Sequence, residues 1–276
     1  MIRLQAFGVP ALFVDGEALH DGLWRQTRRF AVLIYLACAA GNRPHRRDEV
    51  IAIFWPESDL SRGRNALRQA LHVIREELGS EVLLSDGSEN LWVNPHRFTG
   101  DVSAFTVALQ KGDWEAALSL YQGDFLEGFF LTGVRNFEFW VDQRRADLKQ
   151  RAVGAAQNLA QRAEAFRDLE AALHWWRQAL QLRPFHEGII CRIICLLAGS
   201  GNRGEGRAEF ERFRSRLRAE LGVRPSQETL DLVSRMSRGL LREREIWPRE
   251  PRHEHGLLSR PPSPRPWRRP TGHIPR

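Results

Sequence analysis

The first residues of the chain alternate between hydrophobic and polar side chains, and the spacing then changes to that of helices. Ile2–Phe7 and Ala11–Val14 flank a turn at residues 8–10 that contains Gly and Pro, so this stretch is predicted to form a β-hairpin. Gln26–Ala40 is hydrophobic nearly all round, as expected of a buried helix, and Gly41-Asn42 predicts its end. The chain is therefore expected to begin with a small sheet followed by a core helix.

Two more helices and a second hairpin are predicted next. The pattern indicates a short helix over Arg46–Phe54 and a longer one from Asp59 to Leu78, which stops at Gly79. Val82–Leu84 and Leu91–Val93, joined by a polar turn, predict the hairpin. Two helices separated by a turn and followed by a hairpin are the layout of a winged helix-turn-helix, a DNA-binding fold.

The predicted helix from Asp59 to Leu78 has two distinct faces at 100° per residue. One arc carries the hydrophobic side chains expected to pack on the helix over residues 26–40, namely Leu67, Ala70, Leu71, Ile74 and Leu78. The neighbouring arc is polar and consists of Ser61, Arg64, Arg68, His72 and Arg75, with Asn65 and Gln69 beside it. From Arg62 to Arg75 there are four Arg and no acid. Since Arg reads guanine edges and Asn or Gln reads adenine, the polar arc favours a recognition helix.

We therefore expect this helix to approach the bases or phosphates of double-stranded promoter DNA through Arg62, Arg64, Asn65, Arg68, Gln69 and His72. Arg64 and Arg68, one turn apart, are placed for base contacts. Phosphate contacts are expected from Arg75 and from three arginines around the start of the first helix, namely Arg25, Arg28 and Arg29. The alternative is an amphipathic surface helix whose charges only face water.

Residues 101–240 have helical spacing throughout and contain an internal repeat. Asp113–Leu118 and Asp168–Leu173 are near copies of one phrase, and Gly201-Asn202 echoes the second copy 34 residues later. Such helix pairs are typical of tetratricopeptide-like arrays. We predict a mainly α protein with a winged-helix domain at residues 1–99 and a helical domain at residues 100–240. A Pro- and Arg-rich tail at residues 241–276 is expected to be disordered.

The charge of the chain changes this picture only locally. The net charge is +7, but the tail contributes +5 of it, with nine Arg against four acids. Residues 1–100 contain twelve Arg and twelve acids, so a DNA site there depends on where the arginines are placed rather than on bulk charge. The tail is expected to add only non-specific, salt-dependent attraction to DNA.

The sequence lacks the usual signatures of catalysis and of membrane insertion. It has no P-loop, G-x-S-x-G, H-E-x-x-H or C-x-x-C motif, so neither an enzyme nor a cofactor is expected. Cys191 and Cys195 lie in a hydrophobic stretch, where core packing is favoured over half of a metal site or a nucleophile. No segment has the roughly 18 apolar residues of a membrane span, and the N-terminus is unlike a signal peptide. The three cysteines suit a reducing compartment, so we expect a cytoplasmic protein.

Several of these motifs resemble one known family. The first region resembles the OmpR-type winged helix of SARP-type bacterial transcriptional activators in Phe54-Trp55-Pro56, in Arg64–Leu71 ending at Leu78-Gly79, and in Asp101-Val102 with Phe105. The second region resembles their bacterial transcriptional activator domain, most specifically in Leu217–Leu230, and also in Asp124–Leu126 and Phe139-Trp140. The resemblance covers about residues 1–240.

The resemblance implies sequence-specific promoter binding, often at direct repeats, and recruitment of RNA polymerase. The helical domain is then expected to contact the transcription machinery or a second copy in a homodimer. Two departures concern the site: Ala66 replaces a second Asn of the family, and the wing turn Asp86–Glu89 has two acids and no Arg. A different function, a helical-repeat scaffold whose winged helix no longer binds DNA, fits the neutral balance of residues 1–100.

Overall fold

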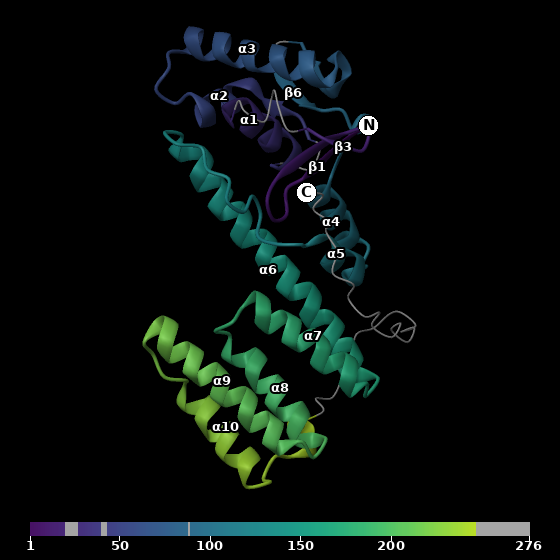
Figure 1. Ribbon diagram of the computed structural model, residues 1–276, viewed down its shortest axis with the longest axis vertical. Coiled ribbons are helices and arrows are strands. Elements are labelled where there is room, and N and C mark those ends of the chain that lie inside the picture. Colours follow the sequence, from purple (N-terminus) through teal and green to yellow (C-terminus); the bar gives the residue numbers. More distant parts are fainter. Residues whose placement is uncertain (20–26, 40–42, 88, 247–276) are drawn as a thin grey trace, which may run out of the picture. The chain divides into compact units, whose positions relative to one another are not determined.

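The computed structural model describes residues 1–19, 27–39, 43–87 and 89–246, which pack as two compact units (Figure 1). The first unit is Met1–Ala155, and the second begins at Ala156. The long helix α6 (Arg135–Ala165) contributes to both. Within the described ranges, the helices are all too short or too polar to cross a membrane.

The first unit begins with the predicted hairpin, which is part of a four-stranded sheet. β1 (Ile2–Gln5) pairs antiparallel with β2 (Ala11–Val14), and β2 pairs antiparallel with β3 (Glu17–Ala18). β7 (Phe98–Gly100) returns to the other side of β1 and runs parallel to it, so the strand order is β3-β2-β1-β7. The hairpin prediction is confirmed, while the pairing of β7 joins residues almost 100 positions apart.

Three helices follow, and the second and third of them form the helix-turn-helix. α1 (Thr27–Cys38) is buried continuously from Phe30 to Cys38, which explains its hydrophobic pattern on all sides. It contacts both α2 (Arg47–Phe54) and α3 (Leu60–Leu78) (Figure 1). The three predicted helices are confirmed, although the predicted first residue of α1, Gln26, and its predicted end at Gly41-Asn42 lie outside the described residues.

The predicted wing is also present. After the short helix η2 (Ser80–Val82), β5 (Leu83–Asp86) and β6 (Asn90–Val93) form an antiparallel hairpin. β4 (His45–Arg46), directly before α2, pairs with the other side of β6. The backbone N–H of Arg47 donates to the carbonyl of Glu89 over 2.8 Å. The start of α2 and the wing are therefore held together by backbone hydrogen bonds.

The ends and the inner face of α3 follow from local chemistry. The Asp59 side chain accepts a hydrogen bond from the backbone N–H of Arg62 over 2.8 Å and caps the N-terminus, while Gly79 ends the helix with a φ of 96°. The inner face is buried through Leu67, Ala70, Leu71 and Ile74, as predicted. A Cβ atom on Gly63 would lie 2.6 Å from Cγ2 of Ile51, so glycine allows α2 and α3 to pack closely.

Two short helices, α4 (Asp101–Gln110) and α5 (Trp114–Leu120), continue the first unit. The half-buried carboxylate of Asp101 accepts hydrogen bonds from the backbone N–H groups of Ala6 and Phe7 over 2.8 and 2.9 Å. The predicted helical domain therefore begins with a residue that is bonded directly to the N-terminal sheet region.

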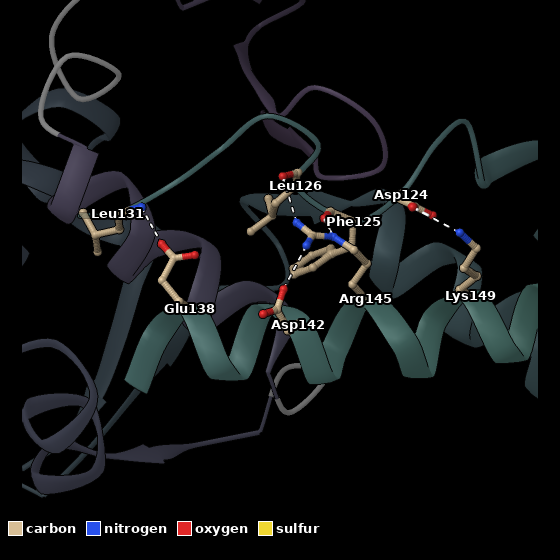
Figure 2. A network of polar contacts seen from close by, with 8 residues as sticks. All are labelled: Asp124, Phe125, Leu126, Leu131, Glu138, Asp142, Arg145 and Lys149. Carbon is tan, nitrogen blue, oxygen red and sulfur yellow. Dashed lines mark hydrogen bonds and ion pairs between the residues drawn. The ribbon is translucent and has the colours of Figure 1, made fainter. Parts of the chain in front are cut away.

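The prediction of helix throughout residues 101–240 is wrong at residues 121–134. This loop pairs with the chain around Gly8: the N–H of Leu126 donates to the carbonyl of Ala6, and the N–H of Gly8 donates to the carbonyl of Asp124. Arg145 of α6 donates to the carbonyls of Phe125 and Leu126, as Figure 2 shows. These long-range bonds replace the hydrogen bonds that a helix would have made.

A second set of contacts fixes the same loop to α6. Lys149 pairs with Asp124 over 3.2 Å, and the Glu138 carboxylate accepts a hydrogen bond from the N–H of Leu131 (Figure 2). The buried ring of Phe125 lies 5.7 Å from that of Trp140. The first half of α6 is therefore part of the first unit.

The second unit is helical and packs consecutive helices in pairs. It contains the end of α6 and the helices α7 (Leu169–Leu182), α8 (Glu187–Gly199), α9 (Arg203–Leu221), α10 (Gln227–Ser237) and α11 (Glu243–Ile246). Its core includes Ile190 and Ile194 of α8 and Phe210, Phe213 and Leu217 of α9.

The internal repeat seen in the sequence corresponds to a repeated turn. Gly112, Arg167 and Gly201 all have a positive φ, of 71°, 54° and 84°. The residue after each donates its N–H to the carbonyl five residues earlier, as Asp113 does to Ala108 over 2.9 Å. Asp113 and the equivalent Asp168 then cap the next helix. The repeated phrase thus encodes a helix end, a turn and a helix start.

The predicted tail begins too early. Leu241 packs against the core of the second unit, and Arg192 of α8 donates to the carbonyls of Glu245 and Ile246 over 2.7 and 3.1 Å. The prediction of disorder is therefore wrong for residues 241–246, because their apolar and backbone groups find partners on α8 and in the core. Residues 247–276 lie outside the described part of the chain.

Candidate nucleic-acid interface

The outer face of α3 carries all six side chains predicted from its pattern. Their side chains are exposed to solvent: Arg62, Arg64, Asn65, Arg68, Gln69 and His72. Arg75 is half-buried, and its Nη2 donates to the carbonyl of Leu83 in the wing over 3.3 Å. A helix with this face, following a short helix and preceding a hairpin, presents hydrogen-bonding side chains in the place where such folds meet the major groove.

The other predicted phosphate contacts lie at the beginning of α1. Arg28 is exposed and Arg29 is half-buried. Arg25 lies outside the described residues. Among the described residues, no hydrogen bond or ion pair joins Arg28 or Arg29 to α3, so their role stays a prediction.

Ion pairs on the outer face of α3 are weak. Arg62 lies 3.3 Å from Asp59, Arg64 lies 3.7 Å from Asp48 of α2, and His72 lies 3.3 Å from Glu76. All of these side chains are more than half exposed, and pairs of this kind contribute at most about 1 kcal/mol. Arg68 has no hydrogen bond or ion pair within the described ranges. The face can therefore exchange its present partners for an anion at little cost.

A cavity of about 570 Å³ opens beside this face, between α2, α3 and the turn of the wing. Four arginines line it: Arg46 comes from β4, Arg47 from the start of α2, and Arg64 and Arg68 from α3. Two acids, Asp48 and Glu89, also line it, so the arginines outnumber the acids by two. The excess positive charge suits a small anionic group.

Arg47 is a candidate residue that the sequence pattern did not reveal. Its Nε atom is buried and has no hydrogen-bond partner in the described part of the chain. Burial lowers the pKa of the Arg47 guanidinium, and the positive charges of Arg75 and Arg68 lower it further. The only local signal is that Arg46 and Arg47 are adjacent at the start of a short helix. Its environment arises from α3 and the wing, which are distant in sequence.

The cysteines lie in hydrophobic surroundings. Cys38 and Cys195 are buried, and Cys191 is half-buried. Burial raises the pKa of the Cys195 thiol to about 11 and also raises that of Cys38, so both thiols are protonated at neutral pH. In the described ranges, no three His, Cys, Asp or Glu side chains gather as metal ligands would. Core packing accounts for both buried thiols.

Comparison with solved structures supports the fold. The structure titled Mycobacterium tuberculosis EmbR in complex with low affinity phosphopeptide matches this chain with a TM-score of 0.61 and 21% sequence identity. The match covers 88% of this chain and 67% of that one. The predicted fold class, a winged helix-turn-helix followed by a helical domain, is confirmed.

Comparison with protein families identifies the helical region. The model of the bacterial transcriptional activator domain matches residues 95–236, which is more than half of the chain. No curated protein matches the chain in sequence. The family is one of transcriptional regulators, and the resemblance noted in the sequence is confirmed. The chain therefore belongs to the family of SARP-type transcriptional regulators that carry a bacterial transcriptional activator domain.

Proposed function

We propose that this regulator binds double-stranded promoter DNA in a sequence-specific way through α3 and activates transcription from there. The observation that carries the proposal is the outer face of α3, where six exposed polar side chains follow one another without an acid until Glu76. The major groove is about 12 Å wide and admits a helix of this kind. The capped ends and the buried inner face of α3 hold its backbone rigid beneath these side chains.

The helical region is proposed to contact RNA polymerase or a second copy of the chain. Membership of the activator family supports a role in contacting the transcription machinery. Binding of two copies at neighbouring sites would suit the direct repeats that the resemblance implies. The first unit extends to Ala155, so part of the family domain packs with the winged helix.

Selection of bound duplexes from a random library by the full chain tests the proposal. We expect a shared motif, and we expect binding to weaken steeply as salt rises, because phosphate contacts release counterions. The variant Asn65→Ala with Gln69→Ala should lose the motif, whereas Arg214→Ala on α9 should keep it.

Two results would contradict the proposal. If no motif is enriched and random duplex is not bound, the scaffold function that the neutral residues 1–100 favour is the better account. If a motif is enriched but survives alanine changes at all six of these exposed side chains, recognition lies outside the outer face of α3.

A further inference from the structure

A cluster of three arginines lies at the cavity: Arg47 and Arg68 line it, and Arg75 is close enough to act on Arg47. Arg47 comes from the start of α2, and Arg68 and Arg75 come from α3. Burial lowers the pKa of Arg47 most, and the positive charges of Arg75 and Arg68 lower it further. Like charges that are brought together and partly desolvated repel one another, so the cluster is favoured when an anion joins it.

The acids nearby do not neutralise this cluster. Asp48 pairs with Arg64 over 3.7 Å, and no described ion pair involves Glu89. Arg75 donates to the carbonyl of Leu83, which is a neutral partner. Arg47 and Arg68 are left with no acceptor for their side-chain N–H groups among the described residues, and the Nε of Arg47 is buried as well.

The polar residues of α3 divide into two stripes. Arg64, Arg68 and Arg75, at spacings of four and seven residues, follow one stripe beside the buried face, and Arg64 and Arg68 line the cavity. Asn65, Gln69 and His72 are on the next stripe, are exposed, and do not line it. The helix therefore presents one group of side chains to the cavity and another away from it.

We propose that the cavity takes one backbone phosphate of the bound DNA, held by Arg47 and Arg68, and that Asn65 and Gln69 contact the bases. This assignment rests on the proposed DNA binding and refines it. A guanidinium binds phosphate oxygens through two parallel N–H groups, which supplies the acceptors that Arg47 and Arg68 lack. Arg68, expected from the sequence to read a base, becomes a residue that positions the duplex.

The first arm of the test measures affinity for the selected operator and for random duplex across a salt series. Arg47→Ala and Arg68→Ala should each weaken both duplexes by the same factor and reduce the salt slope by about 0.9, the value for one phosphate contact. Arg47→Lys and Arg68→Lys keep the charge and should keep the slope. If the two Ala variants lose affinity for the operator alone, or if their salt slope is unchanged, the assignment is overturned. Thermal melting of each variant checks that it is folded.

The second arm tests base contacts by the stripe of α3 that does not line the cavity. Asn65→Ala and Gln69→Ala should each lower the ratio of operator to random affinity by about 5- to 150-fold, as the loss of a bidentate base contact does. Their affinity for random duplex and their salt slopes should equal those of the wild type. If their effect is the same on both duplexes, the two stripes do not have the roles proposed here.

The third arm separates a DNA phosphate from free phosphate. Melting in inorganic phosphate and in chloride at equal ionic strength is compared for the wild type, Arg47→Ala and Arg68→Ala. If phosphate stabilises the wild type through these two arginines while both variants bind the duplexes normally, the cavity takes free phosphate and the DNA assignment is overturned. If the wild type binds no duplex at all, the proposed function itself fails.

Discussion

Helices α3 and α9 have the same length of 19 residues and are both rich in arginine, yet their charges are used differently. α9 has six Arg and four Glu, and three of these arginines have described ion pairs within the helix, as Arg212 has with Glu209 and Arg216 with Glu220 over 3.0 and 2.6 Å. α3 has four Arg, and its two acids come only in its last turn. Pairing within the helix therefore distinguishes the two more clearly than the number of arginines does.

The two helices also correspond to the two interpretations of an arginine-rich helix. α9 matches the alternative considered for α3, an amphipathic surface helix, and half of its arginines pair with glutamates of the same helix. α3 instead leaves Arg68 without a partner among the described residues and holds Arg62 and Arg64 in weak, exposed pairs, while Arg75 donates to the carbonyl of Leu83. A polyanion would displace little on α3 and would have to break several pairs on α9.

The largest expected effect concerns the two faces of α3. Leu71 is 1% exposed, so Leu71→Ala should lower the free energy of unfolding of the first unit by about 2–5 kcal/mol, the usual range for a buried leucine. Arg68→Ala should leave it nearly unchanged, because Arg68 is exposed and has no described partner. Urea denaturation of the full chain measures both. Equal losses would mean that the inner and outer faces have been interchanged.

A smaller effect compares a glycine in each helix. Gly63→Ala brings a Cβ within 2.6 Å of Ile51 Cγ2, and such overpacking costs about 1–3 kcal/mol. Better helix propensity recovers at most about 1 kcal/mol of that. Gly204 of α9 has no atom within 4 Å of the corresponding position, so Gly204→Ala should be neutral or stabilising by up to about 1 kcal/mol.

Thermal melting of the two glycine variants checks this difference. Gly63→Ala should also weaken operator binding, because a shift of α2 relative to α3 moves Arg47 away from Arg68. A stabilised Gly63→Ala variant would show that the helix-turn-helix tolerates a wider spacing than the structure has.

The sequence predicted α3 closely because its signals are local. Asp59 caps it, Gly79 ends it, and its hydrophobic residues recur at helical spacing, so its bounds and both faces could be derived without any other part of the chain. The phrase repeated at Asp113 and Asp168 and echoed at Gly201-Asn202 was found for the same reason.

The failures concern residues whose conformation depends on distant partners. Phe125 and Leu126 are apolar and stand between helices, but their backbone groups are bonded to Ala6 and to Arg145. Leu241 lies in a segment of tail-like composition, yet it packs on a core made by α8 and α9. In the sequence Arg47 resembles any surface arginine, because its environment is formed by α3 and the wing, which are distant in sequence. Such contacts cannot be predicted from local sequence patterns.

The smallest expected effect is the sharpest test of the comparison between α3 and α9. Arg214 of α9 pairs with Glu211 and is about half exposed, so Arg214→Ala should change the free energy of unfolding by no more than about 0.5 kcal/mol. It removes the same single charge as Arg68→Ala and serves as its matched control. Because Arg214 is already paired, its loss should leave the salt slope of DNA binding unchanged, whereas Arg68→Ala should lower it.

Duplex binding by the two variants is measured in parallel salt series. The result shows whether the attraction to DNA depends on which arginines lack an acidic partner or on the total number of arginines. If Arg214→Ala lowers the slope as much as Arg68→Ala does, the total number of arginines sets the attraction to DNA, and α3 has no advantage over α9. If only Arg68→Ala lowers it, an arginine counts toward DNA binding when the fold leaves it without an acid. The neutral balance of residues 1–100 would then be no obstacle to DNA binding, because the pairing of each arginine would matter more than the total charge: Arg64 is paired with Asp48, whereas Arg68 has no partner among the described residues.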